Sequence, residues 1–173
     1  MGDDGVRSKD GDRLEAELYT YGSRPALPPT AEVIKDYLGQ VGFAVDVRVV
    51  EWAAMQSLAE EGRVDMCLMS RQIHQNHDPN SWARDFHPES SYFNYMRYTP
   101  PGVVHLIDSG PKAVEQDLRK ETYDLLQEKN AEDLPVIYLT YHTNIVGLSS
   151  DVRGYEEHPT EYSFHLERVW LED

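Results

Sequence analysis

The sequence predicts an α/β domain: a mainly parallel β-sheet flanked by helices. Strand-like and helix-like segments alternate between residues 14 and 70, which is the pattern of parallel strands joined by right-handed crossovers. The run "VDMCLMS" at residues 64–70 is almost continuously apolar, as expected of a strand that is covered on both faces. A length of 173 residues suits one ordinary domain with a sizeable core.

The first predicted strand is "LEAELYTY", residues 14–21, which alternates as a half-buried strand does. Its predicted inward face is Leu14, Ala16, Leu18 and Thr20. "GSRPALPPT" then ends the strand and leads into a helix from about Thr30, with prolines at its entry. The predicted apolar face of that helix is Val33, Ile34, Tyr37, Leu38 and Val41.

A second strand is predicted at "FAVDVRVV", residues 43–50, from the same alternation. A short helix follows from about Glu51, with Trp52, Met55 and Leu58 as its buried stripe, and ends at Gly62. The third strand, residues 64–70, is expected at a central position of the sheet.

The second half of the chain is less periodic. Residues 92–111 are rich in aromatic residues and proline without a clear period, and residues 111–130 predict a long amphipathic helix. Its stripe would be Val114, Leu118, Thr122, Leu125 and Leu126. Residues 136–149 predict one or two strands, and the chain ends in an alternating Val169 and Leu171.

The charge excludes one class of partner. Thirty-one acidic residues against sixteen Lys and Arg give a formal net charge of −15, which repels nucleic acid and anionic lipid surfaces. The carboxylates are spread over the chain and Arg outnumbers Lys, a composition that suits a high-salt environment. An ordinary acidic protein is the alternative interpretation.

Candidate binding residues gather where the third strand ends, in the stretch "SRQIHQNHDPNSWARDFHPE", residues 70–89. In parallel α/β sheets, ligands bind beyond the carboxyl ends of the strands. Ser23 and Arg24 follow the first strand and are therefore expected at the same edge of the sheet.

Other chemistries find less support. His74, His77 and His87 have a spacing that a zinc-dependent hydrolase site could use, but Pro79 interrupts any helix there and no HExxH or CxxC motif accompanies them. No GxSxG, GxGxxG or GxxxxGK motif is present, and the lone Cys67 lies in an apolar strand, so we predict no catalytic residue, metal or cofactor. A second rival is a protein-interaction module that docks through the aromatic residues 92–98.

Two long runs of the sequence resemble extracellular solute-binding proteins of family 5, which serve peptide, oligopeptide and nickel ABC importers. These runs are "LYTYGSRPALPPTAEVIKDYLGQVGFAVDVRVVEWAAMQSLAEEGRVDMCLMSR" and "DLPVIYLTYHTNIVGLSSDVRGYEEHP". The resemblance implies one lobe of a type II periplasmic-binding-protein fold. Residues 1–144 would form the carboxyl-terminal (second) lobe, and residues 145–173 would cross back to an N-terminal lobe that this chain does not contain.

The resemblance also implies the function and its partners. The chain would belong to the solute-binding component of an ABC importer, which captures a peptide or related small solute, including a nickel chelate, for the membrane permease subunits. It would work outside the cell or in the periplasm, anchored to the membrane in the full-length protein. A small histidine-cluster metal-dependent hydrolase remains the alternative function.

The resemblance places the solute cleft at residues 71–79. The frame "R.W...YDP" of nickel-binding members is matched at Arg71, Asp78 and Pro79, while Ile73 and His77 stand where its aromatic residues would be. Arg24 and Arg71 are expected to bind anionic solute groups, His74 and His77 to make polar contacts, and Trp82 to form an apolar wall. The full expected ligand-binding set is Ser23, Arg24, Arg71, Gln72, Ile73, His74, His77, Asp78 and Trp82.

The acidic composition leads to a first prediction. If the net charge of −15 is an adaptation to salt, molar KCl or NaCl will screen the repulsion between carboxylates and raise the melting temperature. A thermal melting scan across salt concentrations measures this. A flat or falling curve would contradict the halophilic interpretation.

Overall fold

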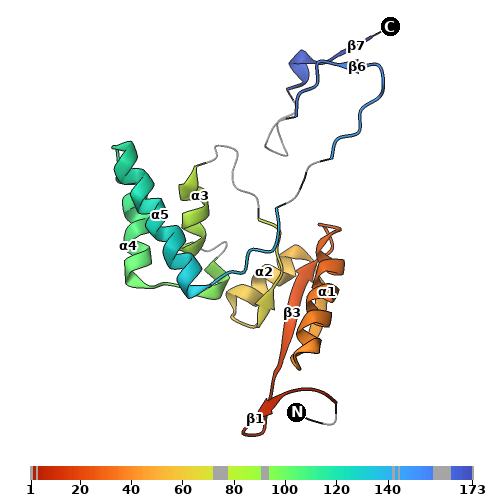
Figure 1. Ribbon diagram of the computed structural model, residues 1–173, viewed down its shortest axis with the longest axis vertical. Helices are drawn as coiled ribbons and strands as arrows, with labels where there is room; N and C mark the ends of the chain where they lie inside the picture. Colours follow the sequence, from red (N-terminus) through yellow and green to blue (C-terminus); the bar gives the residue numbers. More distant parts are fainter. Residues whose placement is uncertain are drawn as a thin grey trace.

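A three-stranded parallel sheet forms the first part of the molecule (Figure 1). The computed structural model describes residues 2, 4–71, 78–90, 94–141, 143, 145–157 and 165–172. Its strands are β3 (Glu15–Tyr21), β4 (Ala44–Val50) and β5 (Met66–Cys67), in the order β4-β3-β5. The whole of β3 pairs with β4, while β5 pairs with β3 at two positions.

The predicted order strand, helix, strand, helix, strand is confirmed. Helix α1 (Leu27–Gln40) joins β3 to β4, and α2 (Trp52–Glu60) joins β4 to β5. Because the two connections run in opposite directions across the sheet, right-handed crossovers put α1 and α2 on opposite faces. In Figure 1 the two helices lie on either side of β3.

Helix α1 starts earlier than predicted, and its core-facing side matches the predicted one only in part. Pro28 and Pro29 stand inside its first turn, where a missing N–H costs no hydrogen bond. The buried side chains are Leu27 and Ala31, whereas three of the predicted core residues are half exposed or more: Val33 at 50%, Tyr37 at 66% and Val41 at 50%. The prediction was right for Ile34 and Leu38, which pack against the core, and wrong for Val33, Tyr37 and Val41. The core-facing row runs from Leu27 through Ala31 to Ile34 and Leu38 at helical spacing.

The central strand is β3, not the third strand as predicted. Leu18 and Thr20 are buried on one face of β3 and Tyr21 on the other, so this strand is covered on both sides. Strand β5 lies at an edge, although the backbone N–H of Leu68 still donates to the carbonyl of Tyr19 at 2.8 Å. Leu14, predicted to face inward, lies just before β3 and is 41% exposed.

A group of helices forms the second part of the molecule, with its own apolar core. It consists of α3 (Pro79–Ala83), η1 (Arg84–Phe86), η2 (Asn94–Met96), α4 (Pro101–Ser109), η3 (Gly110–Lys112) and α5 (Gln116–Asp133). We call it the helical module. Its core, Ala83, Phe86, Val103, Ile107, Tyr123 and Leu126, is separate from the core around the sheet.

The helical module corrects two sequence predictions. Helix α4 lies in a segment predicted to be irregular, and α5 begins at Gln116 rather than near residue 111. Val114 precedes α5 and is 93% exposed, and Leu118 and Leu125 on α5 are also exposed. The proline and glycine at the start of α4 masked its period, because both are unusual in helix interiors but acceptable in a first turn.

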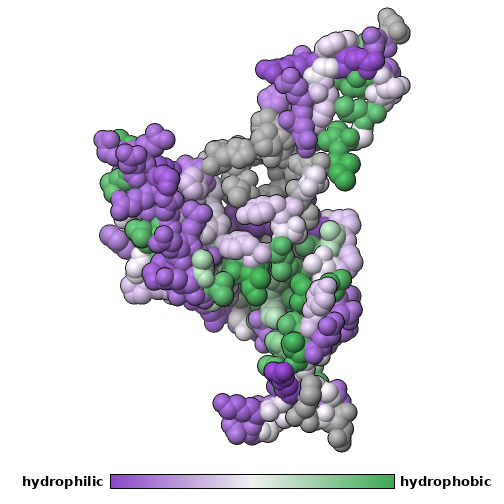
Figure 2. All heavy atoms as spheres, in the orientation of Figure 1, coloured by the Kyte–Doolittle hydropathy of each residue, from purple (hydrophilic) through white to green (hydrophobic). Residues whose placement is uncertain are grey.

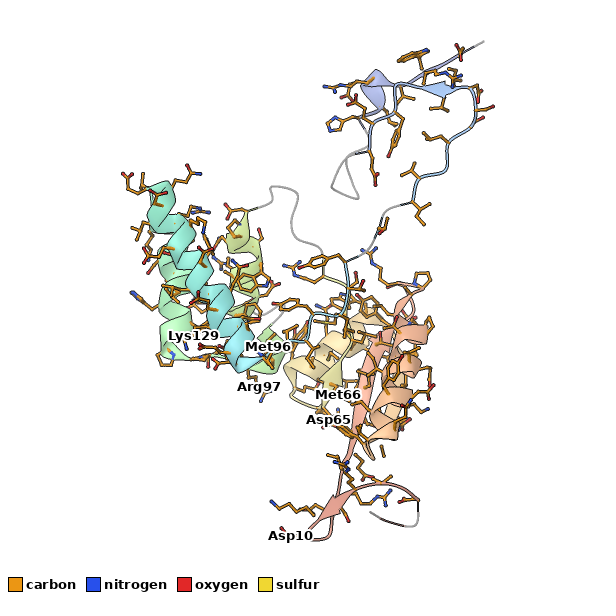
Figure 3. The ribbon with its side chains drawn as sticks, viewed as in Figure 1. Asp10, Asp65, Met66, Met96, Arg97 and Lys129 are labelled. Atoms are coloured by element: carbon orange, nitrogen blue, oxygen red, sulfur yellow. The ribbon has the colours of Figure 1, made fainter. Side chains whose placement is uncertain are left out.

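The arginine Arg97 links the helical module to the sheet part. Its guanidinium donates from Nη2 to the carbonyl oxygen of Glu60 at the end of α2, at 3.3 Å (Figure 3). Gly62, with φ of +72°, lies under the same guanidinium, and a Cβ there would clash with it. The guanidinium can shift, but the positive φ at this turn strains any residue with a side chain, so glycine is favoured there.

The C-terminal segment lies apart from both cores in Figure 1. Strand β6 (Val152–Arg153) pairs antiparallel with β7 (Trp170–Leu171), which lies in the alternating end of the chain. The strands predicted within residues 136–149 are absent from the part of that stretch that the structure describes. Ile137, Leu139 and Ile145 in this stretch stay exposed.

A short hairpin of β1 (Ser8–Lys9) and β2 (Asp12–Arg13) precedes β3. Among the helices that the structure describes, none combines the length and the apolar character needed to cross a bilayer.

The core around the sheet supports a stability prediction. Met55 on α2 is 0% exposed, and truncating such a side chain removes apolar contacts and leaves a cavity. We expect Met55→Ala to lower the free energy of unfolding by about 2–5 kcal/mol. Urea denaturation measures this, with Val114→Ala, at a side chain that is 93% exposed, as the control. Equal midpoints for both variants would contradict the assignment of the core.

Cys67 in β5 supports a reactivity prediction. Burial raises the pKa of its thiol from 9.0 to about 11, so the reactive thiolate fraction at pH 8 falls about a hundredfold. We expect a thiol reagent such as DTNB to label the native chain about a hundredfold more slowly than the chain in urea. Because Cys67 is the single cysteine, the signal needs no deconvolution. Comparable rates in both conditions would show that the thiol is accessible and ionised in the fold.

Candidate functional site

The carboxyl ends of β3 and β5 are tied together by one tyrosine. The hydroxyl of Tyr21 accepts from the backbone N–H of Ser70 at 3.2 Å and donates to the carbonyl of Ser70 at 3.4 Å. The ring of Tyr21 packs edge-on against Trp52 of α2, with centroids 4.8 Å apart. The two strand ends that the sequence predicted to be neighbours therefore meet at one edge.

Ser23 and Arg24 lie at this edge, in the turn between β3 and α1. Ser23 is exposed and Arg24 is half-buried, and the carbonyl of Arg24 accepts the backbone N–H of Leu27 at the start of the helix. Their position beside Tyr21 fits the expected solute edge. Their role in binding stays a prediction.

Arg71, the residue after Ser70, makes a two-pronged ion pair with Asp85 of η1. Its Nε donates to Oδ2 at 2.6 Å and its Nη2 donates to Oδ1 at 2.8 Å. The Asp85 side chain is only 12% exposed and that of Arg71 28%. The Arg71 guanidinium was predicted to bind an anionic group of the solute. In the structure it already pairs with a carboxylate of the protein.

Asp78 is engaged in a similar way. Its Oδ1 accepts the backbone N–H of Asn80 at 2.9 Å and so caps the N-terminus of α3. Both carboxylate oxygens also accept from Nη2 of Arg119 on α5, at 2.8 and 3.0 Å. Gln72, Ile73, His74 and His77, the remaining expected contacts of this loop, lie outside the described residues.

Trp82 of α3 is partly buried against the core of the helical module. Its ring packs edge-on against Phe86, with centroids 5.2 Å apart, and its indole N–H donates to the hydroxyl of Tyr138 at 2.8 Å. That hydroxyl donates in turn to Oδ1 of Asn130 on α5, at 3.1 Å. Trp82 therefore joins α3 to the chain that follows α5, in addition to any contact with a solute.

Sequence reasoning missed Asp85, Arg119 and Tyr138. Asp85 is fourteen residues from Arg71 and Arg119 is forty-one residues from Asp78, so no helical or strand period connects the partners. The one available signal was chemical: a charged residue at a strand end is expected to have a partner when the loop around it is partly buried.

His87, a member of the predicted alternative zinc cluster, has both ring nitrogens occupied. Its Nδ1 accepts the backbone N–H of Glu89 at 3.1 Å, and its Nε2 lies 3.3 Å from Oδ1 of Asp108. Because a carboxylate only accepts, Nε2 carries the proton and no lone pair is left for a metal. Among the described residues there is also no group of three or more His, Cys, Asp or Glu that could hold a metal ion.

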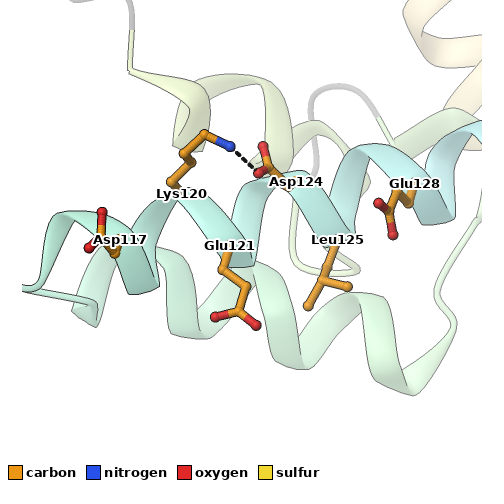
Figure 4. A pocket seen from close by; sticks show the side chains of 6 residues that line it. All are labelled: Asp117, Lys120, Glu121, Asp124, Leu125 and Glu128. Carbon is orange, nitrogen blue, oxygen red and sulfur yellow. Dashed lines mark hydrogen bonds and ion pairs between the residues drawn. The ribbon is translucent and has the colours of Figure 1, made fainter.

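A hollow on the outer face of α5 is lined by residues of that helix alone (Figure 4). Its lining residues are Asp117, Lys120, Glu121, Asp124, Leu125 and Glu128, with an ion pair between Lys120 and Asp124. A small-molecule site needs apolar walls and converging polar groups from more than one element. At the strand-end edge, by contrast, polar groups from β3, from the chain after β5 and from η1 come together, through Tyr21, Ser70 and the pair of Arg71 with Asp85.

Comparison with known proteins finds relatives among peptide-binding proteins. No family model matches the chain. The oligopeptide-binding protein AppA of Bacillus subtilis is 24% identical over 170 residues, which is 97% of this chain and 31% of AppA. A probable di/tripeptide-binding protein 5 of Pseudomonas aeruginosa is 28% identical over 152 residues, 84% of this chain and 29% of that protein.

Solved structures agree on the fold. The structure of Bacillus subtilis AppA in complex with a nonapeptide superposes with a TM-score of 0.80 at 23% identity, covering 99% of this chain and 34% of AppA. The nickel ABC transporter protein of Bacillus halodurans gives a TM-score of 0.67 at 24% identity, covering 76% of this chain and 27% of that one. The periplasmic-binding-protein fold predicted from the sequence is confirmed. The chain spans about a third of the length of these relatives.

Proposed function

From its similarity to the oligopeptide-, dipeptide- and nickel-binding proteins of ABC transporters, we propose that this chain is the carboxyl-terminal lobe of a two-lobed solute-binding protein. The observation that carries the proposal is the match to peptide-bound AppA, which covers 99% of this chain with a TM-score of 0.80. Since the chain covers 34% of AppA, the other lobe would come from sequence outside residues 1–173.

The strand-end edge is the proposed solute-binding surface of this lobe. Ser23 and Arg24 follow β3, and Arg71 follows the end of β5, so the three residues stand where ligands of parallel α/β sheets bind. A solute bound here would be enclosed when a second lobe closes over it by a hinge motion. The solute class is a peptide or a related small solute such as a nickel chelate.

The C-terminal segment supports the two-lobed arrangement. Exposed apolar side chains gather on the described residues 145–157 and 165–172, including Ile145 at 93%, Leu166 at 66% and Leu171 at 67% exposure. Figure 2 shows apolar groups on this end of the molecule. Exposing this many apolar side chains to water is unfavourable in free energy, so we expect them to pack against another protein surface. We assign residues 145–173 to the crossing back onto the N-terminal lobe.

This function implies a place and a set of partners. The full-length protein would capture its solute outside the cell or in the periplasm, anchored to the membrane, and would deliver it to the permease subunits. The net charge of −15 argues against nucleic acid as a partner. The alternative function, a zinc-dependent hydrolase, has no support from His87, because both of its ring nitrogens already have partners.

Isothermal titration of the full-length two-lobed protein tests the proposal. The panel contains dipeptides, oligopeptides and the nickel–histidine chelate, and we expect saturable binding to one of these classes. In an Arg24→Gln, His77→Ala variant the affinity should fall about tenfold, the loss expected when a charge-assisted hydrogen bond is removed. If the protein binds no panel member, the proposed function is overturned. If it binds one and the variant binds it with equal affinity, the proposed binding surface is overturned.

A further inference from the structure

The Trp82 indole stands beside the strand-end edge. Trp82 lies on α3, which runs directly into η1 and its Asp85, the partner of Arg71. Arg71 follows Ser70, whose backbone is tied to the hydroxyl of Tyr21 at the end of β3. Trp82 is only partly buried, so part of its side chain reaches the surface next to this edge.

Two hydrogen bonds in series connect the Trp82 indole to a buried amide on α5. The indole N–H donates to the hydroxyl of Tyr138 at 2.8 Å, and this hydroxyl donates to Oδ1 of Asn130 at 3.1 Å. Asn130 is 5% exposed and belongs to the last turn of α5, so the helix fixes the far end of the series. Burial raises the pKa of the Tyr138 hydroxyl, and the charge of Asp85 raises it further, which places Tyr138 near the pair of Arg71 and Asp85.

A row of aromatic contacts fixes the plane of the same ring. Trp82 packs edge-on against Phe86, and Phe86 packs edge-on against Tyr98, with centroids 5.2 and 6.2 Å apart. The hydroxyl of Tyr98 donates to Oδ2 of Asp133 at 2.5 Å, again in the last turn of α5. The indole is therefore held twice from the end of α5, once through its N–H group and once through its ring.

We propose that Tyr138 and Asn130 are positioning residues of solute recognition: they hold the Trp82 indole in the orientation in which it contacts an aromatic side chain of a bound peptide. This inference rests on the proposed function and names the chemistry of one part of the solute. An indole has a single hydrogen-bond donor, and Tyr138 already accepts from it. Trp82 therefore offers a solute its π-face and its carbon edge, a surface that suits another aromatic ring.

The fixed orientation matters because aromatic pairs are favourable only in edge-to-face or offset-stacked arrangements. A tryptophan side chain turns about two bonds, and freezing such freedom when a solute binds lowers the affinity. The contacts of Trp82 with Tyr138 and Phe86 remove this freedom before the solute arrives.

Selectivity between matched peptides tests the proposal in the full-length protein. Alanine peptides of the length that binds carry one phenylalanine or one leucine, placed at each position in turn, and their affinities are measured by isothermal titration. At one position we expect the wild type to prefer phenylalanine by about three- to tenfold, the gain typical of an aromatic pair. Tyr138→Phe, which removes only the hydroxyl, should bring this ratio close to one. A ratio near one in the wild type, binding of the nickel chelate alone, or an unchanged ratio in Tyr138→Phe would overturn the inference.

The selectivity ratio separates positioning from a general effect on folding, which would lower both affinities together. Asn130→Ala should reduce the ratio in the same direction, and the double variant with Tyr138→Phe should be no less selective than Tyr138→Phe alone, because Asn130 acts through Tyr138. Additive losses in the double variant would contradict that series of contacts. The matched control is Tyr37→Phe, at a side chain of α1 that is 66% exposed, which should leave the ratio unchanged.

Exchange of the indole N–H groups gives a readout on this chain that needs no solute. The chain has three tryptophans, and Trp82→Phe identifies the NMR signal of Trp82. We expect its N–H to exchange at least about tenfold more slowly than that of Trp170, which is 59% exposed, and Tyr138→Phe to abolish the difference. Equal rates in the wild type would overturn the contact between Trp82 and Tyr138, and the inference with it. If the rates differ as expected but the full-length protein binds no panel member, the contact stands and the proposed function fails.

Discussion

The ion pair between Arg71 and Asp85 is the contact on which the arrangement of the two cores depends. The sheet part and the helical module have separate apolar clusters, so burial inside each cluster does not fix the position of one relative to the other. Arg71 leaves the sheet at the end of β5, and its two-pronged contact with Asp85 sets both distance and angle. The hydrogen bond from Arg97 to Glu60 adds a second, weaker polar link.

Polar links suit a binding edge better than an apolar seam would. An apolar contact tolerates sliding, whereas a bidentate pair holds one geometry. Breaking it is costly, because Asp85 would remain buried without its partner. Tyr21 also joins the ends of β3 and β5 at this edge. The residues that follow each strand therefore start from fixed backbone positions. Precision at this edge therefore comes from polar geometry, and stability comes from the two cores behind it.

The sequence predicted the sheet and its crossovers well, because periodicity reports burial of a face by local neighbours. Sequence periodicity did not predict burial or pairing where these depend on contacts between distant elements. Leu18 and Thr20 were recognised as core, but the burial of Tyr21 on the other face depends on α2. The strands predicted within residues 136–149 do not form in the part of that stretch that the structure describes, because an alternating sequence becomes a strand only when it pairs with another strand. At the site, strand-end residues were found from topology, while Asp85 and Arg119 left no local pattern because their partners are distant in sequence.

The acidic surface and the partly buried pair of Arg71 and Asp85 respond differently to salt. At molar ionic strength the Debye length is about 3 Å, so exposed charges separated by more than this are screened. The surface pair of Arg168 and Glu156, 66% and 77% exposed, lies in that regime. The pair of Arg71 and Asp85, 28% and 12% exposed, is shielded from mobile ions by the protein around it. Salt therefore removes repulsion between surface carboxylates while the pair between the two cores keeps its geometry, so a strongly acidic chain can still hold its strand-end edge in one arrangement.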